Sequence, residues 1–295
     1  MTKVIVTGSS GFIGRYVTTR LLETGYAVIS IDCQDNKQND SIVHITSKLS
    51  NCSLIDKCVA EIKQSDVMVH LAADISVPGD SATIGNNVGC MLSALKIAEK
   101  CNVKHFVYLS SIPVIGEIEY TPIDELHPVH PQTPYHWSKY ICEQMLNSYG
   151  DIFETITIIR IPSPIGVGMR NNVFLSVLIN RMLKNENVDI YGTGSRIQNY
   201  IDVRDIADAI LHVVHIKPQG LYLIAGKESI SNFALADLCK TILGKNVQIQ
   251  CGRYPDPEES EKWIISYHKA QITFGYQPLY SIEDTIRWIY SCFNK

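Results

Sequence analysis

The stretch Val4-Ile-Val-Thr-Gly-Ser-Ser-Gly-Phe-Ile-Gly14 decides the fold of this chain of 295 residues. It begins with a β-branched run, continues through three glycines, and leads into a segment of helical period over residues 12–23. Glycines allow a tight turn and let the backbone approach a pyrophosphate, whose charge is stabilised by free N–H groups and the dipole at a helix N-terminus. The stretch therefore predicts a strand, a dinucleotide-binding turn and a helix.

The acidic residue that such a turn needs further along the chain is Asp32, at the end of the second expected strand. A carboxylate there can accept hydrogen bonds from both ribose hydroxyls and would repel a 2′-phosphate. No Arg or Lys lies between Gly8 and Gly14 or beside Asp32. NAD is therefore the expected cofactor, in preference to NADP.

Short apolar runs alternate with helix-period segments through the first two thirds of the chain. The expected strands are 4–7, 27–31, 67–71, 106–109 and 156–159, and the expected helices between them are 12–23, 54–63, 88–100 and 136–149. Alternation of this kind predicts a parallel sheet covered on both faces, with right-handed crossovers. The fold class is therefore α/β, with a doubly wound parallel sheet of the Rossmann type.

The pattern loosens after about Arg160, where prolines and glycines crowd together, and the later expected helices 205–216, 233–243 and 282–293 are separated by irregular stretches. We expect a Rossmann domain over residues 1–165, with 200–216 packing back on it. Residues 166–295 would then form a smaller, mixed C-terminal lobe that binds the substrate.

Composition excludes several classes of protein. Apolar residues make up 45% and charged residues 19%, which is ordinary for a globular protein and argues against disorder. The net charge is −4, so there is no general excess of positive charge to hold a nucleic acid. No apolar stretch reaches the roughly 18 residues that span a bilayer, so no membrane partner is expected.

The nine cysteines are odd in number and include no C-x-x-C pair, a pattern typical of neither a disulfide framework nor a zinc site. They indicate reduced thiols. No secretory signal opens the sequence. A cytoplasmic protein without a bound metal is expected.

A second candidate motif combines Tyr135 with Lys139. Thr133-Pro134 predicts a helix start, and the two side chains stand four positions apart, on one face of that helix. A phenol has a pKa of about 10, but a neighbouring ammonium and an oxidised nicotinamide favour the phenolate, which can exchange protons with a hydroxyl. The alternative is a buried Tyr beside a snorkelling Lys. The glycine turn and the serine pair after a strand favour catalysis.

The glycine spacing resembles that of the extended short-chain dehydrogenases/reductases, in particular the NAD-dependent epimerase/dehydratase family that acts on nucleotide sugars. Further similar segments span nearly the whole chain: His70-Leu-Ala-Ala73, Asn87-Val88, Phe106-Val-Tyr-Leu-Ser-Ser111, Tyr135-His-Trp-Ser-Lys139, Arg160-Ile-Pro, Tyr191-Gly-Thr-Gly194 and Val203-Arg-Asp205.

This resemblance implies a catalytic group of Ser111, Tyr135 and Lys139, in which Lys139 also binds the nicotinamide ribose. Ser111 is preferred to Ser110 because family members carry the hydroxyl five residues before a glycine, here Gly116. The implied NAD-binding residues are Gly8, Ser10, Gly11, Phe12, Ile13, Gly14, Asp32, Leu49, Leu71, Ala72, Ala73, Asn87, Tyr135, Lys139 and Ile161.

The substrate side departs from the family pattern. Ser163 and Gln198 stand where family members present an Asn and a phosphate-binding Arg, although Arg196 could replace the latter and Arg253 resembles a second phosphate arginine. The implied substrate-binding residues are Ser111, Tyr135, Ser163, Asn172, Phe174, Tyr191, Gln198 and Arg253.

The reaction type depends on the residues next to Ser111. Ile112-Pro113 replaces the Asp-Glu pair of 4,6-dehydratases and the glutamate of decarboxylases, so neither reaction is favoured. Because Asp32 indicates NAD, the prediction is a nucleotide-sugar epimerase acting at C4 through a 4-keto intermediate, with Tyr135 as the acid/base. The alternatives are a 4-keto-sugar reductase, a non-sugar NAD-dependent alcohol dehydrogenase and an idle NAD-sensing module. The family also implies a homodimer through residues 87–100 and 135–149.

Overall fold

A computed structural model describes residues 2–35, 42–50, 55–76 and 79–293. Its largest feature is a seven-stranded sheet in the order β10-β6-β5-β4-β1-β2-β3, in which every neighbouring pair is parallel. The strands are β1 (Lys3–Thr7), β2 (Ala27–Asp32), β3 (Val43–Thr46), β4 (Val67–His70), β5 (His105–Ser111), β6 (Thr155–Ile161) and β10 (Gly220–Leu223).

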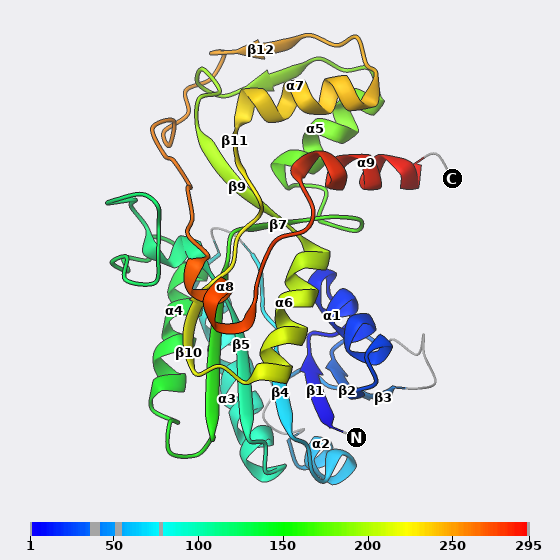
Figure 1. Cartoon of the computed structure of the whole chain (residues 1–295), viewed down its shortest axis with the longest axis vertical. Helices are drawn as coiled ribbons and strands as arrows, with labels where there is room; N and C mark the ends of the chain where they lie inside the picture. The colour runs from blue at the N-terminus through cyan, green and yellow to red at the C-terminus, as the bar shows by residue number, and fades with distance from the viewer. Residues whose placement is uncertain (1, 36–41, 51–54, 77–78, 294–295) are drawn as a thin grey trace.

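Helices cover both faces of this sheet (Figure 1), because its strand side chains alternate between two buried cores. Val4 and Val6 pack with α1 (Phe12–Glu23) and α6 (Val203–Ile216). Ile5, between them, packs into the opposite core. The helices on that side are α2 (Ile55–Ile62), α3 (Ser81–Lys100) and α4 (Pro134–Asn147). The predicted doubly wound α/β fold is confirmed.

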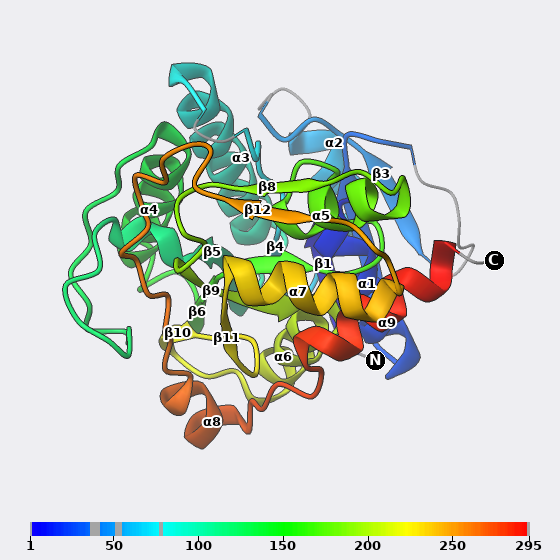
Figure 2. The same cartoon turned by 90° about the horizontal axis from the view of Figure 1, so that it is seen from above.

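A smaller lobe stands beyond the carboxyl ends of the strands, at the top of Figure 1 and facing the viewer in Figure 2. It holds a three-stranded sheet of β11 (Ser229–Ser231), β9 (Ile197–Asp202) and β7 (Ser163–Ile165), and a two-stranded pair of β12 (Ile249–Cys251) and β8 (Val188–Ile190). Its helices α5 (Phe174–Leu183), α7 (Asn232–Leu243) and α9 (Ile282–Phe293) share one apolar core.

The chain returns to the large sheet after residue 165. Helix α6 packs beside α1, β10 pairs with β6 at the sheet edge, and α8 (His268–Phe274) buries Ala270 and Phe274 in the same core. Sequence patterns missed β10 because it is four residues long and begins with a glycine at φ 113°. They missed β3 because it is a short edge strand with polar residues.

Helix α3 begins at Ser81, earlier than the expected residue 88. Asp80 and Thr83 form a reciprocal cap, in which Thr83 N donates to Asp80 Oδ1 (3.0 Å) and Asp80 N donates to Thr83 Oγ1 (3.2 Å). Helix α4 confirms the start predicted from Thr133-Pro134, since the Thr133 hydroxyl accepts a hydrogen bond from His136 N and Pro134 is the first helical residue. The helix runs over Pro134–Asn147 and so lies slightly earlier than the expected range 136–149. Of the expected helix 54–63, residue 54 lies outside the described residues.

Two further properties concern the whole described chain. None of its helices has both the length and the apolar character needed to cross a membrane. Within the same residues, no group of three His, Cys, Asp or Glu side chains is placed to hold a metal ion.

Candidate active site

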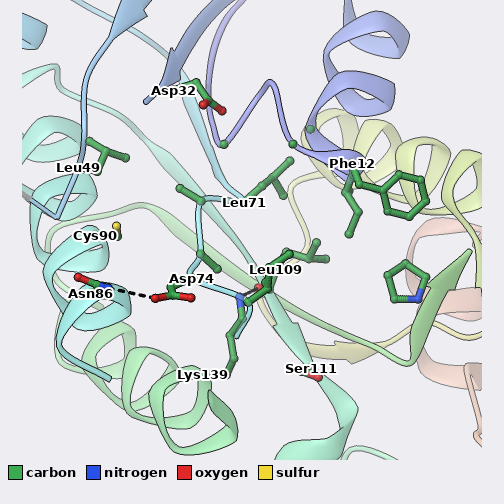
Figure 3. Close-up of a pocket in the computed structure, with 18 of the residues that line it drawn as sticks. Phe12, Asp32, Leu49, Leu71, Asp74, Asn86, Cys90, Leu109, Ser111 and Lys139 are labelled. Atoms are coloured by element: carbon green, nitrogen blue, oxygen red, sulfur yellow. Dashed lines mark hydrogen bonds between the residues drawn. The ribbon is translucent and has the colours of Figure 1, made fainter. Parts of the chain in front are cut away.

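A cavity of about 650 Å³ opens at the carboxyl edge of the large sheet, below the smaller lobe (Figure 3). Its walls come from the β1–α1 turn, the ends of β2, β4 and β5, helix α4 and the segment that follows β6. In doubly wound sheets, ligands bind at this edge.

The glycine turn forms one wall and is closely packed. A Cβ on Gly14 would lie 2.0 Å from the Gly8 carbonyl oxygen, and Gly8 itself has φ 70°, with its missing Cβ directed at Ala72 N (2.7 Å). Only glycine fits either position, which explains the spacing seen in the sequence.

The same turn presents groups suited to an anion. The N-cap residue of helix α1 is Gly11, which has no side chain to cap the first helical N–H groups. Ser10 Oγ is buried without a hydrogen-bond partner in the described structure. Free N–H groups at a helix N-terminus and an unsatisfied hydroxyl fit the pyrophosphate of a dinucleotide.

Asp32 lies at the far end of the cavity, as expected for a ribose-binding carboxylate. Its Oδ2 accepts from Ser10 N and its Oδ1 from Gln34 N, each at 2.9 Å, so the side chain is fixed in place. Lys48 and the buried Leu49 line the same end.

The predicted NAD-binding residues mostly line this one cavity: Gly8, Gly11, Phe12, Ile13, Gly14, Asp32, Leu49, Leu71, Ala72, Ala73, Tyr135, Lys139 and Ile161. Asn87 does not. Its side-chain amide is used to join α3 to neighbouring segments, donating to Ser138 Oγ (2.7 Å) and the Asp74 carbonyl (3.0 Å) and accepting from Asp74 N (2.6 Å). Asn86 lines the cavity instead and donates to the Asp74 carboxylate.

Ser111, Tyr135 and Lys139 meet at the other end of the cavity. Lys139 Nζ donates to the Leu109 carbonyl oxygen at 2.9 Å and lies 6.0 Å from the centre of the Tyr135 ring. Both Ser110 and Ser111 line the cavity, but Ser110 is buried and its hydroxyl donates to Glu143 Oε1, whereas Ser111 is only half-buried. The geometry thus favours Ser111 as the hydroxyl that reaches a ligand.

Burial changes the acidity of this group. It raises the pKa of Tyr135 to about 12, against a smaller lowering by the Arg170 guanidinium. It lowers the pKa of Lys139 to about 8, which Cys142, Glu143 and Cys90 partly oppose. Desolvation is thus the dominant influence on the Tyr135 phenol, and the predicted acid/base role, which counts on an oxidised nicotinamide as well as on the ammonium, stays a prediction.

Arg170 is the functional candidate that sequence reasoning missed. It lies in the segment between β7 and α5, lines the cavity, and donates from Nη1 to the Ile75 carbonyl at 2.8 Å. The opposite side of this segment is held by Tyr16 Oη, which donates to the Val167 carbonyl at 2.9 Å. The glycines and prolines of the segment indicated a loop, but a loop composition does not show where its arginine points.

Of the predicted substrate residues, Ser163 joins Ser111 and Tyr135 at the cavity wall. The others are not among the residues that line it. Gln198 pairs with Ile230 between β9 and β11, Phe174 packs against the core of the smaller lobe, and Tyr191 is exposed beside Tyr254. Asn172 is exposed.

The two arginines considered for phosphate binding are also engaged elsewhere. Arg196 is surrounded by the carboxylates of Asp256, Glu258 and Glu261, so it does not replace the missing arginine at Gln198. Arg253 is exposed and lies 3.7 Å from Asp189.

Comparison with known proteins agrees with this architecture. The model of the NAD dependent epimerase/dehydratase family matches residues 4–225, and the chain belongs to that family. The predicted family, the enzyme class and NAD as the cofactor are thereby confirmed.

Individual relatives are similar over nearly the whole chain. The putative UDP-glucose 4-epimerase of Methanocaldococcus jannaschii is 29% identical over 305 residues, covering 96% of each chain. The structure of UDP-glucose 4-epimerase from Thermotoga maritima with UDP-glucose has a TM-score of 0.89 at 24% identity, covering 99% of each chain. The Thermus thermophilus UDP-glucose 4-epimerase complex with NAD has a TM-score of 0.88 at 22% identity, also covering 99% of each. These structures share the fold.

Proposed function

We propose that this protein is an NAD-dependent epimerase that inverts C4 of a nucleotide-activated sugar. The observation that carries the proposal is the convergence of Ser111, Tyr135 and Lys139 on a cavity whose other end holds the glycine turn and Asp32. The names of the relatives, several of which are UDP-glucose 4-epimerases, support the same activity.

The chemistry at the catalytic end is set by these side chains. Tyr135 would take the proton of the C4 hydroxyl and return it to the new hydroxyl after inversion. Ser111 would donate a hydrogen bond to that oxygen, and the Lys139 ammonium would stabilise negative charge on the phenolic oxygen. NAD, when bound, would supply the acceptor for the C4 hydride and, once reduced, the donor that returns it to the opposite face of the 4-keto sugar, and its positive ring would favour ionisation of Tyr135.

The residues after Ser111 argue against the related eliminations. Ile112 is fully buried and Pro113 comes next in a short 3₁₀ turn, Ile112–Ile115, so neither can act as an acid or a base. What remains is transfer of hydride at one carbon, because this reaction needs only the Tyr, Ser and Lys side chains and the nicotinamide.

The residues that would contact the nucleotide half of the substrate are also part of this proposal. Ser163 and Arg170 are the residues of the smaller lobe's entry segment that line the cavity beside Tyr135 and offer a hydroxyl and a cation. Asn172, Phe174, Tyr191, Gln198 and Arg253 remain predicted contacts. The predicted homodimer through α3 and α4 is supported by the partly exposed Leu92 and Trp137 on these helices, and a cytoplasmic location stays a prediction.

The test is to purify the protein, identify any retained nicotinamide, and assay UDP-sugar interconversion. An epimerase retains NAD and interconverts the two sugars with no net change in nicotinamide absorbance. Tyr135→Phe should abolish interconversion, whereas Tyr140→Phe, on the same helix but outside the cavity wall, should not. Stoichiometric consumption of added NADH or NADPH would instead identify a ketoreductase or dehydrogenase.

A further inference from the structure

A buried ion pair lies directly behind the catalytic group. Glu143 Oε2 accepts from Arg160 Nη2 at 2.6 Å, and Glu143 Oε1 accepts from both Arg160 Nε at 2.9 Å and Ser110 Oγ at 2.5 Å. All three residues are at most 3% exposed. Charges buried to this degree need each other, because removing one leaves the other without solvent or a partner.

The members of this ion pair are adjacent in the chain to the catalytic residues. Ser110 immediately precedes Ser111 in β5, and Arg160 is its register partner in β6. Glu143 follows Lys139 by four positions in α4, as Lys139 follows Tyr135, so the three lie along one stripe of the helix. The carboxylate therefore connects the helix that carries Tyr135 and Lys139 to the strand that carries Ser111.

A second bond joins the same two elements at the neighbouring residue of β5. Lys139 Nζ donates to the carbonyl of Leu109, and Glu143 binds the hydroxyl of Ser110. Two successive strand residues thus hold two successive turns of the helix. If the Glu143 bond were lost, the single Lys139 bond would not be enough to hold α4 in place, and the helix would move away from β5.

We propose that Glu143 is a positioning residue for the catalytic group. Its bonds to Ser110 and Arg160 fix α4 against β5 and β6 and thereby set where the catalytic side chains meet. The proposal rests on the proposed function in that it assumes chemistry at Tyr135.

Glu143 also affects the charge of Lys139. The titratable or charged groups that face the ammonium come from four elements: Tyr135, Cys142 and Glu143 on α4, Cys90 on α3, His70 on β4 and Tyr108 on β5. Burial raises the pKa of both Cys90 and Cys142 to about 11 and lowers the pKa of His70 to about 3. These groups are neutral near pH 7, so Glu143 is the negative charge among them.

The test begins with Glu143→Gln, which keeps the size of the side chain and removes its charge. We expect kcat to fall about tenfold or more with KM little changed, since a small misplacement of reacting groups lowers the rate rather than binding. Because the neutral amide no longer favours the ammonium, the alkaline limb of the kcat profile should move to lower pH. The matched control is Asp205→Asn, a buried carboxylate that binds Leu279 N and Tyr280 N away from the cavity. It should reduce stability without either kinetic change.

A second variant keeps the proposal testable if Glu143→Gln folds poorly. In Glu143→Leu with Arg160→Met, both charges are replaced by apolar side chains, which buried ion pairs often tolerate. We expect its stability to approach that of the wild type while kcat stays at least about tenfold lower. Recovery of kcat together with stability would show that the ion pair is merely structural and would overturn the proposal.

Crystal structures provide a readout that does not depend on activity. In either variant the Lys139 Nζ to Leu109 O separation should lengthen beyond hydrogen-bonding distance. An unchanged bond, or a kcat loss that Asp205→Asn reproduces, would count against positioning by Glu143. If the wild type fails to interconvert sugars, the proposed function has failed, and the comparison of structures still decides the role of Glu143.

Discussion

Lys139 Nζ donates a hydrogen bond to the main-chain carbonyl of Leu109, 2.9 Å away, and is only 5% exposed. The ammonium therefore lines the cavity and also connects α4 to β5 by a hydrogen bond. This double role has a consequence for stability, because a buried ammonium is held away from water in the folded protein and exposed in the unfolded one.

Lys139→Met should change how stability depends on pH. Burial lowers the pKa of Lys139 to about 8 from its ordinary 10.5, so the unfolded chain binds the proton more tightly. Between these two values the wild type gains stability as pH rises, and the gain is absent in Lys139→Met. Urea titrations at pH 7.5 and pH 10.5 measure the free energy of unfolding of each protein. Between these two pH values, the wild type should gain up to about 3 kcal/mol relative to Lys139→Met. A pH-independent difference would contradict the lowered pKa.

Gly14→Ala should disable cofactor binding through the shape of the turn. The added methyl group would lie 2.0 Å from the Gly8 carbonyl oxygen, so the turn or the helix must move. We expect a loss of retained NAD and a fall in melting temperature. Gly85→Ala is the control, since nothing lies within 4 Å of its missing Cβ in α3, and it should stabilise the protein by about 0.4–1 kcal/mol.

Asp32→Asn should weaken NAD binding and reduce discrimination against NADP. The amide cannot accept hydrogen bonds as well as the carboxylate does from Ser10 N and Gln34 N, and it no longer repels a 2′-phosphate. Isothermal titration with both cofactors measures the ratio of the two dissociation constants. We expect that ratio to move at least about tenfold toward NADP, roughly 1.4 kcal/mol. A constant ratio would show that Asp32 does not select the cofactor.

Arg170→Met should shift the pH at which the enzyme becomes active. The guanidinium lowers the pKa of Tyr135, so its removal raises that pKa further, and the acidic limb of the kcat profile should move to higher pH. KM should also rise if the cation contacts the substrate. Arg181→Met, on the exposed side of α5, serves as the control and should leave both values unchanged.

The parts of this site that the sequence predicts are the local ones. The glycine turn is specified by steric contacts within a few residues of chain, and the Thr133-Pro134 start places Tyr135 and Lys139 on one helix face whatever surrounds them. Ser111 is preferred to Ser110 only through the resemblance, by its spacing of five residues from Gly116, and that choice stays a prediction.

The parts that the sequence does not predict depend on distant contacts. Arg196 could equally have faced a phosphate, and only the folded chain shows that a segment about 60 residues later surrounds it with Asp256, Glu258 and Glu261. Arg170 reaches the cavity because its loop is attached to Ile75 and to α1, neither of which is near it in sequence. Asn86 and Asn87 are adjacent in α3 but point in different directions, so Asn86 lines the cavity while Asn87 bonds to Ser138.

The late return of the chain to the large sheet affects how the protein is made. The core on the α1 side of that sheet includes Tyr222, Phe274 and Tyr276, and Tyr276 Oη donates to the Ala225 carbonyl at 2.6 Å. A ribosome that has released only the first 165 residues has therefore supplied every predicted catalytic side chain but not the strand that covers the edge of β6. During synthesis the core of the nucleotide-binding half is therefore incomplete until Tyr276 has been added, so both lobes should complete folding together.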